Sequence, residues 1–594
     1  MAESVPVTDF KDLSKIYTKI RQNRNNACSD LRKIHALDTE TYNGNIFLIC
    51  DSDGLFLDDI TPELVINWLF SQKYQGSWNF FYNLSYDAEV ILKLLGKELF
   101  KYRTTGKLEF NFVKYRIVYY PSKCLKITAG HHSTIFYDIA QFYHSGLADA
   151  YQNNIGKLSE SYLDIKKNRS QFTLRYYNHN KKKIRNYCTT DCILTKQLAE
   201  KWVKLFHCAF SFYPAKWPSS GYLAEKVLIN HGVNFPKFDT IPYLIQDLSF
   251  RSYFGGRFEM IKRGHVGESY LYDINSAYPH AIANLPDLND GKWLKKKTMH
   301  KDAKLGFFKI LCDIPDTKHI PPFPFRTNNN IVFPTGKFIT YCTLAELQAC
   351  KDDSLYRILE GYQFFANSDI HPYRVFIEKL YQKRIELKNQ NNPLQQPIKI
   401  ILNSIYGKTG QKVNRVMGNL FNPVIFSYIT GFTRAQLYRF MRKNDLERDI
   451  VAFATDSICS TRKLDVNSTK LGDFSFEGES SDTFFLQNGF YRFNGKWKQR
   501  GIGKLGSREI EHLDTIEKDG KLIAKLQVLR NSRLRSSIIQ NKLQDIGKIK
   551  QITKEINLNA DRKRLWLGKI ASINQKESND SVAISLNHFR KEQV

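Results

Sequence analysis

The sequence predicts an α+β protein built from several domains. Its 594 residues are enough for about four domains of ordinary size. Hydrophobic residues make up 42% of the chain, as in folded proteins, and both strand-like and helix-like segments occur along it. A segment rich in proline, serine and glycine, SFYPAKWPSSG at residues 211–221, indicates a first domain boundary.

The charge of the chain indicates a polyanionic partner. There are 88 lysines and arginines against 59 acids, a formal charge of +29, which favours nucleic acid, although surface charge that only confers solubility is the alternative. No stretch approaches the ~18 consecutive apolar residues of a membrane span, and the N-terminus does not resemble a secretory signal. The 10 cysteines are scattered without a C-x-x-C pair, which indicates free thiols in a reducing, intracellular compartment.

The first 205 residues predict a mixed domain. Residues 1–30 are polar and basic, and we interpret them as an extension. Two apolar runs, 33–40 and 45–54, are separated by a turn and predict a hairpin. The segment 181–206 predicts one long helix, because Tyr187, Asp191, Leu194 and Leu198 are spaced to share a face.

The remaining residues predict a second set of elements. A strand is expected at 269–279, followed by an irregular insertion with short strands. Helices at 373–388 and 397–407, joined by the turn NQNNP, predict a helical hairpin. A further helix is expected at 427–443 and an apolar strand at 449–460. The last ~85 residues are strongly basic and predict helical patches.

Four acids and a tyrosine in the first domain predict a metal site. Asp38 and Glu40 lie at i and i+2 of a strand, on one side of it, where a divalent cation would neutralise them; a solvated strand face is the alternative. Asp87 follows the apolar strand WNFFY. Tyr187 and Asp191 are one helical turn apart, although a helix surface with an acid is the simpler interpretation of that pair alone. Together, such acids could hold two metals that activate a water, with Tyr187 orienting the water.

A second set of residues predicts phosphoryl chemistry. Asp273 and Asp456 each stand at the end of a strand, where they would hold two Mg²⁺ ions for nucleotidyl transfer. Lys399, Asn403 and Tyr406 share one helix face, from which the lysine could contact a triphosphate and the tyrosine a base or sugar. A core tyrosine and a surface lysine are the alternative. The preceding helix adds cations, among them Arg384 and Lys388, which could equally form a solvated basic face.

These motifs carry a family resemblance that runs in order over residues 31–508. D-x-E, N-x-x-Y-D (from Asn83) and Y-x-x-x-D resemble the three motifs of the proofreading 3′–5′ exonuclease domain of DNA polymerases. D-x-x-S-x-Y-P, K-x-x-x-N-S-x-Y-G and A-T-D-S resemble the polymerase motifs of family B DNA polymerases. Tyr253, Gly255 and Gly256 match the Y-x-G-G motif of the small protein-primed phage and linear-plasmid members.

The resemblance implies a division of the chain. It implies a ribonuclease-H-like 3′–5′ exonuclease domain followed by a right-hand palm, fingers and thumb. The expected parts are an N-terminal extension (1–30), the exonuclease domain (31–205), a linker with the Y-x-G-G motif and the first part of the palm (206–285), an insertion resembling the priming-protein-contact region (286–365), fingers (366–412), the second part of the palm (413–508) and the thumb (509–594).

The resemblance also implies residue roles. Asp38, Glu40, Asp87 and Asp191 become the metal ligands of the nuclease, and Tyr278 the steric gate against ribonucleotides. The Y-x-G-G motif and Asn83 would contact DNA, and Lys498 and Arg500 lie in a basic motif expected to grip the primer, with Lys498 the favoured lysine. Each active site would hold two Mg²⁺ ions, which Mn²⁺ could replace.

One departure from the family pattern keeps alternatives open. Ala454 stands where the family has the first aspartate of D-T-D-S, although Asp456 is retained. The first hypothesis is a proofreading, protein-primed replicative polymerase of a viral or plasmid linear genome. The alternatives are a family B polymerase without a priming protein, and a weakly active DNA-binding relative, which only Ala454 supports.

The same resemblance implies the surroundings of the protein. The expected partners are primer-template DNA, dNTPs and a terminal priming protein, with no membrane and a monomeric chain. The expected location is the cytoplasm of a host cell or an organelle with a linear element. The short stretch between Lys399 and Asp456 leaves little room for a second insertion, which puts unaided strand displacement in doubt.

Overall fold

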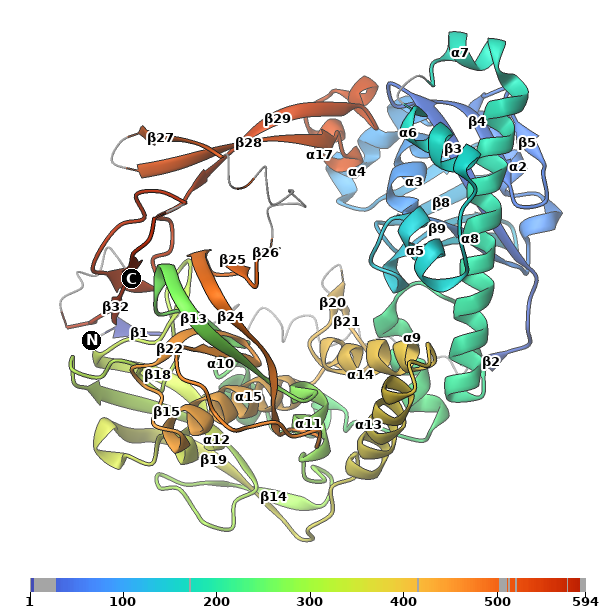
Figure 1. Cartoon of the computed structure of the whole chain (residues 1–594). Coiled ribbons are helices and arrows are strands. Elements are labelled where there is room, and N and C mark those ends of the chain that lie inside the picture. Colours follow the sequence, from blue (N-terminus) through green and yellow to red (C-terminus); the bar gives the residue numbers. More distant parts are fainter. Residues whose placement is uncertain are drawn as a thin grey trace.

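The computed structural model describes residues 2–4, 28–169, 172–413, 416–500, 510, 513–518, 521–573 and 575–587. Most of the expected N-terminal extension and the expected boundary at 508/509 lie outside these ranges. The ribbon runs around a ring, with residues 31–205 on one side and the C-terminal arm crossing back to them (Figure 1). Among the described residues, no helix is both long enough and apolar enough to cross a bilayer.

The first domain is built on an eight-stranded sheet. The strand order is β5-β4-β3-β6-β10-β9-β8-β7, with β3, β6 and β10 parallel and the other pairs antiparallel. The strands are β3 (Ile34–Tyr42), β4 (Asn45–Asp51), β5 (Phe56–Leu57), β6 (Trp78–Phe81), β7 (Glu109–Phe112), β8 (Tyr115–Tyr120), β9 (Cys124–Ala129) and β10 (His132–Asp138). The expected hairpin is confirmed, because β3 and β4 pair across a turn at Asn43 and Gly44, both with positive φ.

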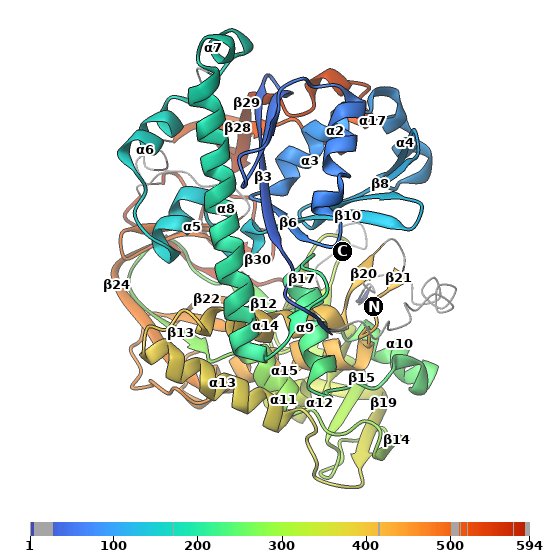
Figure 2. The ribbon, with the colours of Figure 1, turned by 90° about the vertical axis from the view of Figure 1, so that its right-hand side faces the viewer.

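Helices cover this sheet on both faces. The expected long helix is confirmed as α8 (Lys181–Phe210), which runs the height of the domain against β3 and β4 (Figure 2). Residues of α2 (Pro62–Leu69) and α3 (Leu84–Lys93) pack into a separate core with Phe81 and Phe136 of the sheet. The smaller helices are α4 (Lys101–Thr105), α5 (Leu147–Asn154), α6 (Glu160–Lys167) and α7 (Leu174–His179).

A second eight-stranded sheet lies at the centre of the other half. Its order is β12-β22-β23-β13-β24-β25-β26, and β31 also pairs with β13. The strands are β12 (Arg257–Met260), β13 (Arg263–Ile274), β22 (Ile450–Thr455), β23 (Ser457–Ser460), β24 (Phe474–Gln487), β25 (Phe490–Phe493), β26 (Lys496–Gln499) and β31 (Ser578–Asn579). The expected strands at 269–279 and 449–460 are therefore present, but each ends or turns at the acid that the motif contains.

Helices pack beside the second sheet. The expected helical hairpin is confirmed as α13 (Arg374–Asn389) and α14 (Gln395–Thr409), which contact each other. The expected helix at 427–443 begins earlier, as α15 (Pro423–Lys443), because the Asn422 side chain accepts hydrogen bonds from the N–H groups of Val424 and Ile425. The others are α9 (Ser220–Asn230), α10 (Tyr243–Arg251) and α11 (Ala277–Ala283).

The insertion is more regular than the sequence indicates. A five-stranded sheet, in the order β1-β18-β15-β19-β14, replaces the expected short strands. Its members are β1 (Ala2–Glu3), β14 (Gly291–Lys295), β15 (Leu305–Ile314), β18 (Gly336–Thr343) and β19 (Tyr356–Ala366), with α12 (Leu344–Cys350) following β18. The prolines that make the sequence look irregular, at 321–325, lie in the connection between β15 and the short pair β16 (Phe325–Arg326) and β17 (Ile331–Val332).

The C-terminal prediction of helical patches is largely wrong. The main feature is an antiparallel three-stranded sheet of β27 (Asp514–Lys518), β28 (Lys521–Asn531) and β29 (Ile549–Asn557), and α17 (Leu534–Ile539) is a short helix between β28 and β29. Along β28, Ala524 and Leu526 are buried whereas Lys525 and Gln527 are exposed. Alternation of buried and exposed residues is typical of a strand. It is hard to see in the sequence because this segment is rich in basic residues.

The C-terminal arm is fastened to the first domain. Lys93 donates hydrogen bonds to the carbonyl oxygens of Gln544 and Ile546 (3.2 and 3.3 Å), and Arg103 donates to that of Ile538 (2.9 Å). The Glu89 carboxylate accepts from the N–H of Leu534 at 3.0 Å. These contacts, between segments more than 400 residues apart, close the ring seen in Figure 1.

A buried ion cluster ties the second sheet to the C-terminal segment. Glu259 of β12 accepts hydrogen bonds from Arg257 (2.6 Å) and Arg564 (3.0 Å), and all three residues are at most 2% exposed. Burial raises the pKa of Glu259, but the two guanidinium groups outweigh it and hold the pKa below its usual value.

We expect Glu259→Gln to lower the free energy of unfolding by about 3 kcal/mol, because two buried guanidinium groups lose their counter-charge. Chemical denaturation monitored by circular dichroism measures the change. The matched control is Glu360→Gln, which removes a carboxylate from an exposed pair with Lys295 and should cost less than about 1 kcal/mol. Equal costs in the two variants would contradict the prediction.

Candidate functional site

The first acidic cluster lies where β3 passes under α8. Oxygens of Asp38 and Glu40 and the Sγ of Cys188 lie within 4.8 Å of one another, a spacing that fits ligands around one cation. Glu40 is buried and Asp38 half-buried. Because the two acids are at i and i+2, the strand presents both toward α8.

Asp87 and Asp191 complete this cluster from two helices. The pKa of Asp38 is raised well above its usual value by burial and then by the charges of Asp87, Asp191 and Glu40. Burial also raises the pKa of Asp87, to about 7, although Thr39 donates a hydrogen bond to it (2.6 Å). Four carboxylates so close together in a buried site are stable as anions only with added positive charge, which a metal supplies.

Tyr187 faces the same cluster with its hydroxyl group. Its ring stacks on that of Tyr162 at 5.4 Å, and burial together with the charge of Asp191 raises its pKa. The Tyr187 hydroxyl is buried beside Asp191, whose pKa it lowers against the effect of burial. A hydroxyl that donates to a carboxylate can still accept a hydrogen bond from a water.

Sequence reasoning missed three neighbours of this cluster. Tyr162 donates a hydrogen bond to Asp191, and Cys188 lies beside Asp38 and Glu40. The positive charge of Arg169 lowers the pKa of Asp191 against the effect of burial. Cys188 is adjacent to Tyr187 in the sequence, so position could have suggested it, but Tyr162 and Arg169 carry no motif.

The second acidic cluster lies at the turn between β22 and β23. Asp273 is the penultimate residue of β13 and pairs with Ser457, and the N–H of Ile274 donates to the carbonyl oxygen of Asp456 (3.0 Å). Both carboxyl groups are half-buried. Burial, followed by the charges of Asp456 and Glu477, raises the pKa of Asp273 to about 8. Glu477, on β24, is a third acid of this cluster that sequence reasoning missed.

The turn that holds Asp456 is tight. Thr455 has φ of +69°, and the N–H of Asp456 donates to the carbonyl oxygen of Ala454 at 2.8 Å. Ala454 pairs with Ser457 in the ladder and is half-buried. The alanine thus occupies a strand position without altering the turn that presents Asp456.

Three tyrosines from different motifs meet beside this cluster. The rings of Tyr278 (α11) and Tyr406 (α14) are 4.4 Å apart, and the hydroxyl groups of Tyr406 and Tyr253 are 3.1 Å apart. Burial raises the pKa of Tyr278 to about 12, and the charge of Asp456 adds to the effect. Tyr278 therefore lies within electrostatic range of the acid.

A family model described as DNA polymerase type B, organellar and viral, matches residues 71–417, more than half of the chain. The chain belongs to this family. It is 26% identical to a DNA polymerase of Acidianus bottle-shaped virus (isolate Italy/Pozzuoli) over 552 residues, which cover 85% of this chain and 81% of the viral one. A probable DNA polymerase of Ascobolus immersus is 25% identical over 263 residues, 42% of this chain and 21% of that protein.

Solved structures share the polymerase fold. Phi29 DNA polymerase complexed with primer-template DNA and incoming nucleotides is similar with a TM-score of 0.62 at 14% identity, covering 89% of this chain and all of that one. Its complex with primer-template DNA alone gives 0.58 at 15% identity, with the same coverage. The expected fold class, a nuclease domain followed by palm, fingers and thumb, is confirmed, and the protein is a DNA-directed DNA polymerase.

The other residues expected to contact nucleotide lie on the polymerase's two hairpin helices. Arg384 donates a hydrogen bond to the Ser276 hydroxyl (3.1 Å), at the start of α11, so its guanidinium lies near the Asp273 cluster. Lys399, Asn403 and Lys388 are exposed on the same pair of helices. The structure thus brings Arg384 and Tyr406 toward the acids and leaves the other three open to solvent.

The residues expected to contact DNA are dispersed. Gly255 has a φ of +73°, and its carbonyl oxygen accepts a hydrogen bond from Arg434 of α15. The carbonyl oxygen of Tyr253 accepts one from Arg326 (2.5 Å). Lys498 and Arg500 are exposed at β26 and just after it, and the positive charge of Arg500 reaches Tyr278. Asn83, exposed and with φ of +63°, precedes α3 in the first domain.

Gly256 fits directly against the turn of Asp456. A Cβ at this position would lie 2.8 Å from Cγ2 and 3.1 Å from Cα of Thr455. We expect Gly256→Ala to push Thr455 aside, move Asp456 and lower the rate of primer extension about 10²-fold, because small misplacements at an active site are costly. Steady-state extension measures the loss. Gly156→Ala, at a position with an ordinary φ and open space around it, is the control for fold stability; full activity in Gly256→Ala would contradict the prediction.

Proposed function

We propose that this polymerase extends primers at the Asp273 cluster and removes mismatched ends at the Asp38 cluster. The observation that supports both activities is the presence of two separate groups of converging acids with raised pKa values, one in each sheet. Accordingly, we assign 31–205 to the exonuclease, 206–285 and 413–508 to the palm, 366–412 to the fingers and 509–594 to the thumb. Residues 286–365 form the insertion.

At the polymerase site, each residue has a proposed task. Asp273 and Asp456 hold two Mg²⁺ ions, which Mn²⁺ can replace and which supply positive charge to the primer hydroxyl and the leaving pyrophosphate. Arg384, Lys388 and Lys399 bind the triphosphate. Tyr278 packs against Tyr406 and blocks the space that a ribose 2′-hydroxyl needs.

At the nuclease site, Asp38, Glu40, Asp87 and Asp191 are the proposed metal ligands. Tyr187 orients the attacking water through its hydroxyl group. Asn83 contacts the single strand as it enters, and the basic segment around Lys498 and Arg500 holds the primer. Gly255 and Gly256 support the template beside the palm.

The proposal also covers how DNA synthesis starts. The fold shared with phi29 polymerase, the Y-x-G-G motif and the insertion with its four strands of the five-stranded sheet support a start from a terminal priming protein on a linear genome. The contacts of Lys93 and Arg103 with the thumb would retain DNA between the two sites. We propose that the enzyme works as a monomer in the cytoplasm of a host cell or in an organelle.

The experiment uses a labelled primer on a DNA template with Mg²⁺. Extension with dNTPs and shortening without them are expected, whereas loss of both, with Mn²⁺ as well, would overturn the proposal in favour of the DNA-binding alternative. A second template carries no primer. No synthesis should start on it without a priming protein; copying by this chain alone would replace protein priming with primer-independent initiation.

Tyr278→Val should lower the discrimination against ribonucleotides about 10²-fold, because the smaller side chain leaves room for the 2′-hydroxyl. Single-nucleotide incorporation of dATP and ATP gives the ratio of kcat/KM values. Tyr278→Phe keeps the ring and should keep the discrimination. An unchanged ratio in Tyr278→Val would remove the gate role.

A further inference from the structure

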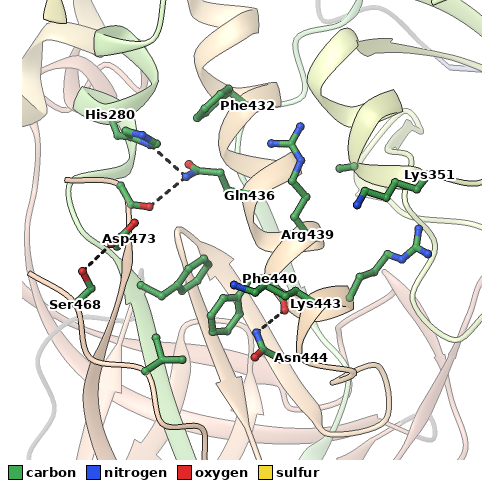
Figure 3. Close-up of a pocket in the computed structure, with 15 residues that line it drawn as sticks. His280, Lys351, Phe432, Gln436, Arg439, Phe440, Lys443, Asn444, Ser468 and Asp473 are labelled. Carbon is green, nitrogen blue, oxygen red and sulfur yellow. Dashed lines mark hydrogen bonds between the residues drawn. The ribbon is translucent and has the colours of Figure 1, made fainter. Parts of the chain in front are cut away.

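A basic cavity lies on the palm, and its lining includes no residue of the two acidic clusters. It encloses about 840 Å³, a volume in the range of small-molecule sites, and lies between α15, the end of α12 and the loop before β24 (Figure 3). None of the proposed catalytic residues lines it. Below it is called the palm cavity.

Four cations line the palm cavity and outnumber its one lining acid, Asp473. They are Lys351, Arg439, Arg442 and Lys443, from α15 and the end of α12. In the parts of the chain that the structure describes, none of them forms an ion pair. Asp473, the acid on the opposite wall, instead accepts a hydrogen bond from the Ser468 hydroxyl at 2.7 Å.

Among the four cations, Arg439 is the one whose positive charge is disfavoured by burial. It is half-buried, and burial lowers its pKa. Its Nη2 donates to the carbonyl oxygen of Ala345 (3.0 Å), and no carboxylate of the described residues forms an ion pair with it. A partly desolvated guanidinium without a counter-charge is stabilised by an anion, and guanidinium groups bind phosphate in a bidentate manner.

The rest of the cavity lining includes phenylalanine rings and the side-chain amide of Gln436. The rings of Phe440 and Phe474 stack at 3.7 Å, and Phe432 lies nearby on α15. The Nε2 of Gln436 bonds His280 and the carbonyl oxygen of Gly472, both at 3.2 Å. Its Oε1 is buried and, among the described residues, has no donor. An amino group of a base could supply one.

The combination selects among anions. Inorganic phosphate would use the cations but not the rings, and an acidic peptide would need no planar apolar surface. A nucleotide uses all three features, since its phosphates, flat base and amino or imino groups match the cations, the phenylalanines and the Gln436 oxygen.

We propose that the palm cavity is a second nucleotide site, which binds a free nucleoside triphosphate separately from the polymerase site. Its wall is joined to that site. The N–H of Gly472 donates to the carbonyl oxygen of Asn275 (2.8 Å), and the N–H of Asn275 donates to that of Asp473 (2.9 Å). Asn275 follows Asp273 by two residues. A nucleotide bound in the palm cavity would therefore affect the position of the strand end that carries the catalytic acid.

The test measures binding of fluorescent ATP to the full chain in EDTA, where the metal-dependent polymerase site is silent. Arg439→Gln with Lys443→Gln should weaken binding at least tenfold. The control, Lys297→Gln with Lys301→Gln, removes two exposed charges outside the cavity and should leave binding unchanged. Equal affinity in the two variants, or no binding of ATP at millimolar concentration, would overturn the proposal.

Competition separates the possible ligands. Unlabelled ATP should displace the probe more effectively than pyrophosphate, and equal displacement would overturn the role of the rings. A short oligothymidylate should compete poorly; if it binds through Arg439 and Lys443 more tightly than ATP, the cavity is a strand-binding track and the proposal fails.

Discussion

Asp456→Asn should abolish primer extension and leave primer shortening intact. The substitution keeps the shape of the side chain in the tight turn at Thr455 but removes one of the three acids that meet beside β13. Metal-assisted charge stabilisation contributes several kcal/mol to phosphoryl transfer, so the rate of extension should fall about 10³-fold or more.

The pH dependence of metal binding gives an independent check. The pKa of Asp273 is raised to about 8 by burial and then by Asp456. A proton therefore competes with the metal below about pH 8, and affinity for Mn²⁺ should rise with pH up to that value. In Asp456→Asn the charge of Asp456 is gone, so the pKa of Asp273 falls and this rise should move to lower pH.

Extension and shortening of the same labelled primer, run side by side, decide the assignment. Asp273→Asn should behave like Asp456→Asn. Asp465→Asn, which changes an exposed acid in the loop after β23, is the control and should keep both activities. Extension that survives in both the Asp273 and Asp456 variants would place the polymerase site elsewhere.

Asp38→Ala combined with Glu40→Ala should give the opposite result. Primer shortening should fall about 10³-fold or more, because the cluster loses two of its four acids, whereas extension continues on the other sheet. Mismatched primer ends should then persist and be extended. Burial and mutual repulsion raise the pKa values of both acids, so their removal relieves unfavourable charge and should not lower the melting temperature.

Removal of two exposed acids of the same domain, Asp59→Ala with Glu63→Ala, is the matched control and should leave shortening unchanged. Single-turnover degradation of single-stranded DNA measures the rates. Shortening at the normal rate in the Asp38 and Glu40 variant would show that the first cluster is not the nuclease.

Ala454, and the site residues that no motif contains, show what sequence motifs do not predict. The A-T-D-S departure suggests a weakened site, yet the alanine fits a strand position and the turn still presents Asp456. Tyr162, Arg169 and Glu477 belong to no motif, and only their packing brings them to the acids. The C-terminal strands were missed because basic side chains hide the alternation of β28.

The sequence by itself determined the elements whose signal is local. These are the hairpin of β3 and β4, the long helix α8, the helical hairpin of α13 and α14, and the acids at strand ends, because strand alternation, helical spacing and turn residues act over a few neighbours. Only the tertiary structure decided the distant contacts that no motif implies: Tyr162 with Asp191, Gly256 with Thr455, and Glu259 with Arg564. Such contacts depend on how whole sheets and helices pack, and no pattern along the chain records that packing.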